Sequence, residues 1–81
     1  MMQTPEQIAA GLTKAQRWAL LRSAYYEDRS AYKTAGRYLT ADKRVRWALC
    51  CAGVIYDYLN PVQKLTPLGQ QVRAILENQH E

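Results

Sequence analysis

The side chains best suited to chemistry in this 81-residue chain are two cysteines and one histidine. Cys50 and Cys51 are adjacent, so on a helix their side chains would point about 100° apart and could not bond to each other. His80 lies in a terminal stretch that we expect to fray, without a positioned partner for acid–base work. These three side chains are too few and too unevenly spaced for a zinc site, which needs about four ligands. We therefore predict a protein that is not an enzyme and that holds no metal or cofactor.

Positive charge is concentrated in one part of the chain. The net charge is +4, yet residues 29–46 alone carry +5, because six basic residues there are opposed only by Asp42. The six are Arg29, Lys33, Arg37, Lys43, Arg44 and Arg46. A clustered basic surface favours a polyanionic partner, most commonly nucleic acid. The alternative is a solvated surface that keeps a small protein soluble.

Length and composition indicate one folded domain over residues 1–81. Hydrophobic residues make up 48% of the chain and charged residues 22%, a balance that does not suit disorder. No apolar run reaches the roughly 18 residues of a membrane span. The start of the chain lacks the pattern of a signal peptide, and adjacent cysteines are not a disulfide framework. These features predict a cytoplasmic protein with no membrane partner.

Two capping-box patterns predict helices in the first third of the chain. The first is Thr4-Pro5-Glu6-Gln7, which starts a short helix ending near Gly11. The second is Thr13-Lys14-Ala15-Gln16, which starts a longer helix to about Ala24. Helical spacing predicts that these helices bury Ile8, Leu12, Trp18, Leu20, Leu21 and Tyr25.

The segment from Tyr25 to Leu39 fits two structures. Its tyrosines favour a strand. Ser30, however, could cap a helix over Ala31–Leu39, in which Gly36 would cost about 1 kcal/mol relative to alanine. We predict a short helix here.

The most regular pattern is a basic amphipathic helix over residues 40–52. Thr40 is its expected N-cap, and Asp42 would complement the helix dipole in the first turn. One face is apolar, and Gly53 would end the helix in a left-handed conformation. The apolar face comprises Val45, Ala48, Leu49 and Ala52, with Lys43, Arg44, Arg46, Trp47 and Cys50 elsewhere on the helix.

The last third of the chain reads as a hairpin followed by a helix. Val54–Tyr58 and Val62–Leu65 are candidate strands around a turn at Asn60-Pro61. Thr66-Pro67 then starts a helix, and residues 78–81 are expected to fray. Its apolar stripe is Leu68, Val72, Ile75 and Leu76.

This order of elements resembles winged-helix regulators of the MarR and PadR type. The matching strings are Ala52-Gly53-Val54-Ile55, Leu65-Thr66-Pro67-Leu68-Gly69 and, upstream, Leu12-Thr13-Lys14-Ala15-Gln16. In that family a similar glycine turn leads from the recognition helix into the wing, and a similar Leu-Thr-Pro string starts the next helix. The resemblance covers roughly 60 residues and implies a mostly α winged helix-turn-helix fold with a small β-hairpin. It also implies transcription regulation, and a dimer if the chain is a regulator.

Charge and resemblance together predict binding of double-stranded DNA, with the 40–52 helix in the major groove. The residues expected to contact DNA are Lys33, Arg37, Tyr38, Thr40, Lys43, Arg44, Arg46, Trp47 and Lys64. The alternative is a small phage-type accessory or inhibitor protein that binds a host protein. Tyrosine, tryptophan and arginine are enriched at such interfaces. In that case Tyr56 and Tyr58 would both face outward from the hairpin.

Overall fold

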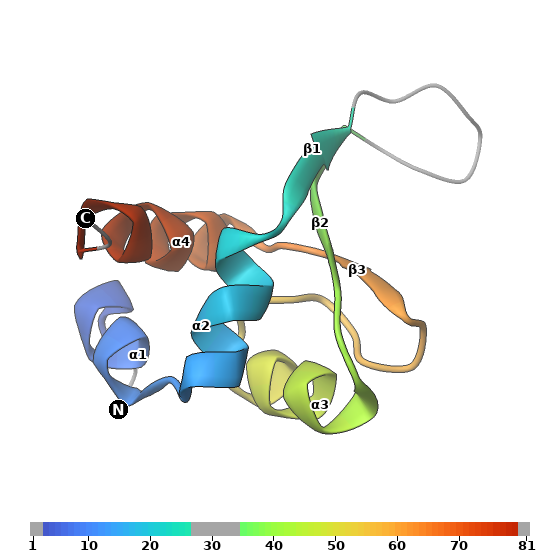
Figure 1. Cartoon of the computed structure of the whole chain (residues 1–81), viewed down its shortest axis with the longest axis horizontal. Coiled ribbons are helices and arrows are strands. Elements are labelled where there is room, and N and C mark those ends of the chain that lie inside the picture. The colour runs from blue at the N-terminus through green and yellow to red at the C-terminus, as the bar shows by residue number, and fades with distance from the viewer. Residues whose placement is uncertain (1–2, 27–34, 80–81) are drawn as a thin grey trace.

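The computed structural model describes residues 3–26 and 35–79 (Figure 1). Within these residues the chain is mostly helical, with four helices and one three-stranded antiparallel sheet of order β1-β2-β3. The elements are α1 (Pro5–Gly11), α2 (Lys14–Leu21), β1 (Ala24–Tyr26), β2 (Gly36–Thr40), α3 (Lys43–Cys51), β3 (Val62–Lys64) and α4 (Pro67–Gln79). Helix α1 packs on α4, and α2 lies between α4 and α3 (Figure 1).

Both predicted capping boxes are present. The Thr4 hydroxyl accepts the Gln7 amide at 3.2 Å, and the Gln7 side chain accepts the Thr4 amide at 2.9 Å. Thr13 and Gln16 repeat the arrangement at 3.2 and 3.0 Å. Each box satisfies two amide groups that a helix N-terminus otherwise leaves without partners, which explains why α1 and α2 begin where they do.

Thr13→Ala is expected to lower the free energy of unfolding by about 1 kcal/mol, because it removes the hydroxyl that caps α2. Urea denaturation of the two proteins measures the difference. Thr13→Ser keeps a capping hydroxyl and should stay within about 0.5 kcal/mol of the wild type. Equal losses in the two variants would show that the hydroxyl does not cap the helix.

The helix predicted over Ala31–Leu39 is wrong in its described part. Residues 36–39 belong to β2, while Ser30 and residues 31–34 lie outside the described residues. β2 is the central strand, pairing with β1 on one side and β3 on the other, so both neighbours satisfy its backbone. Gly36 has φ +155°, which no helix accommodates. The predicted helix to Ala24 is also too long, because Ala24 begins β1.

The core gathers where α2, α3, α4 and the sheet meet. Its largest fully buried side chains are Leu20, Leu39, Leu49, Val54, Ile55, Leu65 and Val72. The predicted burial of Trp18 and Tyr25 is wrong, because their exposed fractions are 61% and 59%. The predicted burial of Leu20 is confirmed: it is fully buried and lies two positions from Trp18, thus about 200° around α2.

Helices α3 and α4 are joined through the backbone of Gly53 and Val54. Gly53 adopts φ +81°, as predicted for the end of α3. The Val54 amide donates to Leu49 at 3.1 Å, and its carbonyl accepts the Thr66 amide at 3.0 Å. The Thr66 hydroxyl donates to the Gly53 carbonyl at 2.6 Å and accepts the Gly69 amide at 3.0 Å. One hydroxyl therefore caps α4 and fastens it to the end of α3.

The predicted hairpin is only partly formed. Val62–Lys64 is strand β3, but its partner is β2, whereas Val54–Tyr58 contributes only a bridge between Ile55 and Leu65. The predicted start of α4 at Pro67 is confirmed, as is the packing of its stripe from Leu68 to Leu76 against the core. The helix includes Asn78 and Gln79, which were expected to fray.

No helix in residues 3–26 or 35–79 is long and apolar enough to cross a membrane. The same residues contain no group of three or more potential metal ligands.

Candidate nucleic-acid interface

The outer face of α3 carries the exposed part of the basic segment. Lys43, Arg44 and Trp47 are all exposed, with Trp47 at 56%. Leu49 is fully buried, and Val45 and Ala52 pack against the core, so the predicted division into an apolar and a basic side is confirmed. Among the described residues the ion pair is Arg73–Glu77 on α4, and no carboxylate there pairs with Lys43 or Arg44.

The start of α3 differs from the prediction. The N-cap is Asp42, whose carboxylate accepts the Val45 amide at 2.9 Å. Thr40 is the last residue of β2, paired with Val62, and is exposed beside the helix start. Since the Asp42 carboxylate already occupies the helix N-terminus, an anion at this face would meet the side chains of Lys43 and Arg44 rather than the helix amides.

Arg46 has a different role from its neighbour Arg44. It is half-buried, and its Nε donates to the Tyr58 carbonyl at 2.9 Å while a terminal nitrogen donates to the Ala41 carbonyl at 2.7 Å. These bonds hold the segment after α3 against the segment before it. To contact a guanine, Arg46 would have to break at least one of these two hydrogen bonds. The main role of Arg46 is therefore to stabilise the fold.

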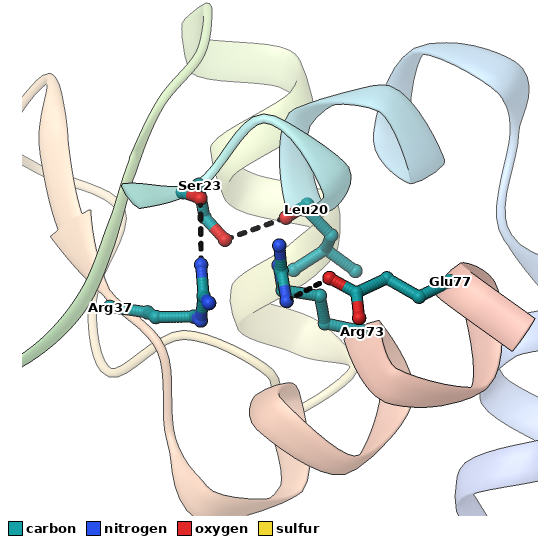
Figure 2. Close-up of polar contacts among 5 residues, drawn as sticks. All are labelled: Leu20, Ser23, Arg37, Arg73 and Glu77. Atoms are coloured by element: carbon teal, nitrogen blue, oxygen red, sulfur yellow. Dashed lines mark hydrogen bonds and ion pairs between the residues drawn. The ribbon is translucent and has the colours of Figure 1, made fainter. Parts of the chain in front are cut away.

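Arg37 is also engaged with the backbone (Figure 2). From β2 it donates to the Ser23 carbonyl at 3.0 Å, just beyond the end of α2. The buried Ser23 hydroxyl donates to the Leu20 carbonyl at 2.6 Å. A cation at a helix C-terminus is electrostatically favourable. This side chain therefore fastens the sheet to α2.

The remaining predicted DNA contacts lie on the sheet or outside the described residues. Tyr38 and Lys64 are register partners on β2 and β3, and both are half-buried. Tyr38 also contacts Tyr26 edge-on, with ring centroids 6.0 Å apart. Lys33 lies outside the described residues. The structure thus brings Lys43, Arg44 and Trp47 together on one open helix face and gives Arg37 and Arg46 backbone partners.

The two residues of the predicted protein interface differ in exposure. Tyr56 is 62% exposed, but Tyr58 is half-buried, its amide bonded to the Asp57 carboxylate at 2.6 Å. Leu59 and Val62, which follow Tyr56 in the chain, are exposed as well. Both cysteines are free thiols: Cys50 packs against the core, and Cys51 is exposed.

A second exposed surface was not predicted. It lies on the outer side of α2, where Lys14, Arg17, Trp18 and Leu21 line a hollow and Arg22 lies over the Trp18 ring. The available signal was the basic residue four positions on either side of Trp18, a pattern that suits a solvated helix face better than a core.

Fold and surface define a small, mostly helical domain with a three-stranded antiparallel sheet and an exposed basic helix face. No family model matches the chain, and neither a curated protein nor a solved structure matches it.

Proposed function

We propose that this chain is a non-catalytic module that binds double-stranded DNA through the outer face of α3. One observation carries the proposal: Lys43, Arg44 and Trp47 are exposed together there, and no described carboxylate neutralises the two cations. Binding to a phosphate then releases counterions without first breaking an ion pair. An α-helix also fits the major groove, where recognition helices use their N-terminal residues.

The order of elements around α3 supports a winged-helix-like use of this face. The left-handed Gly53, the Ile55–Leu65 bridge, β3 and α4 follow α3 in the order that the resemblance implies. The segment before α3 differs, because strand β2 stands where the family has a helix. In the proposed complex α3 lies in the major groove, while Thr40 at the end of the central strand β2 and Lys64 on the edge strand β3 lie toward the phosphates.

The test is binding of a random-sequence DNA duplex at several salt concentrations. The wild type should bind non-specifically with a Kd of about 10⁻⁴–10⁻⁶ M near physiological salt. Lys43→Ala/Arg44→Ala should weaken binding and reduce the slope of log affinity against log salt by about 1.8, or about 0.9 per lost phosphate contact. Fluorescence anisotropy of a labelled duplex measures both quantities.

The matched control is Lys14→Ala/Arg22→Ala, which removes the same charge from the outer side of α2. It should leave the salt slope within experimental error of the wild type. Absence of wild-type binding at low salt would refute the proposal. Equal loss in the two double variants would mean that net charge, and not the α3 face, attracts the duplex.

A protein partner at the segment after α3 is the second candidate. Tyr56 and Leu59 are 62% and 68% exposed, and Val62 is exposed at the start of β3. Apolar surface of this kind marks interaction sites. Binding through it would depend little on salt and would not require Lys43 or Arg44.

A further inference from the structure

The outer side of α2 forms a hollow that is separate from the α3 face. Lys14, Arg17, Trp18 and Leu21 line it, and its volume is about 680 Å³, within the roughly 300–1,000 Å³ typical of binding clefts. Trp18 is 61% exposed. The guanidinium carbon of Arg22 lies 5.0 Å from the centre of the Trp18 ring, a cation–π contact.

The hollow continues toward α4. A smaller hollow is lined by Arg17, Leu21, Leu76 and Gln79, so the two share Arg17 and Leu21. Together they form a groove, here called the α2–α4 groove, from the outer side of α2 to the last turns of α4. Arg17 is held in its wall, because its Nε donates to the Leu12 carbonyl at 3.1 Å.

The charge of this groove is entirely positive among the described residues. Lys14 and Arg17 line it and Arg22 borders it, while no described acidic side chain lines either hollow. The apolar residues that line the groove are Trp18 and Leu21 on α2 and the largely buried Leu76 on α4. A complementary ligand must therefore carry carboxylates or phosphates and also present an apolar group.

The geometry points to a docking surface for an acidic peptide segment of a partner protein. Its carboxylates would pair with Lys14, Arg17 and Arg22, and an aliphatic or aromatic side chain would enter beside Trp18 and Leu21. Exposed tryptophan and arginine are the residue types that dominate the energetics of protein interfaces. A leucine side chain makes neither a hydrogen bond nor an ion pair with a phosphate. The lining by Leu21 and Leu76 therefore favours a peptide over a nucleic acid.

This surface shares no residue with the α3 face, so a negative result for peptide binding leaves the proposal of DNA binding unaffected, and the reverse also holds. The test is selection from a random-sequence peptide library on the immobilised full chain, followed by affinity measurements with the enriched peptides. We expect enrichment in Asp and Glu together with aliphatic or aromatic residues. Trp18→Ala and Lys14→Glu should each weaken binding at least about tenfold, as for a residue central to an interface.

Matched controls are available on α3. Trp47→Ala removes a tryptophan of similar exposure, and Lys43→Glu makes the same charge reversal as Lys14→Glu. Neither should change peptide affinity by more than about twofold, consistent with distant sites acting independently. The indole NH signal of Trp18 in a ¹⁵N NMR spectrum should shift with the peptide, and that of Trp47 should not.

Three results would overturn the inference. The first is a selection that yields no peptide, or peptides without acidic enrichment. The second is self-association of the chain that Trp18→Ala abolishes, which would make a second copy the occupant. The third is a shift of the Trp18 indole signal on adding duplex DNA, which would assign the groove to nucleic acid.

Discussion

Gly69→Ala is expected to lower the free energy of unfolding by about 3 kcal/mol, the upper part of the usual range for overpacking a core. A Cβ atom at Gly69 would overlap the carbonyl oxygen of Val54 and approach its carbonyl carbon within 3.0 Å. The obstacle is backbone that also accepts the Thr66 amide, so it cannot move aside as a side chain would. The steric cost exceeds the gain of about 1 kcal/mol that alanine normally brings to a helix.

Thermal denaturation provides the measurement. In a domain of this size, 3 kcal/mol corresponds to a decrease of roughly 12–24 °C in Tm. Gly11→Ala is the matched control, because nothing lies within 4 Å of a Cβ built at Gly11. That variant should be neutral or more stable by up to about 1 kcal/mol. Similar melting temperatures for the two variants would contradict the close approach of α4 to Val54.

The second large effect is expected at Arg46. Arg46→Ala removes two charge-assisted hydrogen bonds, to the carbonyls of Ala41 and Tyr58. Bonds to charged groups contribute about 1.5–3 kcal/mol each when isolated. Since this side chain is only half-buried, solvent screening reduces the combined loss to about 2–3 kcal/mol. Arg46→Lys should recover only part of it, because an ammonium cannot span both carbonyls as the guanidinium does.

Arg44→Ala is the control for this prediction. Arg44 is exposed on the same helix, and its loss should change stability by no more than about 0.5 kcal/mol. Urea denaturation of the wild type and the three variants, read by the fluorescence of Trp18 and Trp47, gives the comparison. Equal stability of the Arg44 and Arg46 variants would show that the hydrogen bonds from Arg46 to Ala41 and Tyr58 do not stabilise the protein. A loss of DNA binding in an Arg46 variant must therefore be corrected for its unfolded fraction.

The elements that sequence predicts correctly depend on short-range interactions. The capping boxes join Thr4 to Gln7 and Thr13 to Gln16, three residues apart. The helix prediction failed over residues 36–39, because the structure of these residues depends on a distant partner. Tyr38 pairs with Lys64 across the sheet, and no pattern among the residues around Tyr38 predicts that pairing. Without it, a helix and a strand were nearly balanced.

The distinction between short-range and long-range interactions also applies to the two arginines of the candidate site, Arg44 and Arg46. Arg44 and Arg46 are both basic residues of one amphipathic helix, and the helical pattern predicts similar exposure for them. What distinguishes them is the course of the chain near Tyr58, which brings a carbonyl to Arg46. Trp18 shows a related limit. Its hydrophobic character indicates burial, yet α2 presents Leu20, with Ala19 and Leu21 beside it, to the core and leaves Trp18 exposed.

The junction of Gly53, Val54, Thr66 and Gly69 also bears on how α3 meets any partner. Because backbone groups and the Thr66 hydroxyl fasten α4 to the end of α3 at this junction, the C-terminus of α3 is held in place. A partner that docks on α3 thus meets a preorganised backbone, and little conformational entropy of the main chain is lost on association. The conformational entropy that binding still costs comes from ordering the side chains of Lys43 and Arg44.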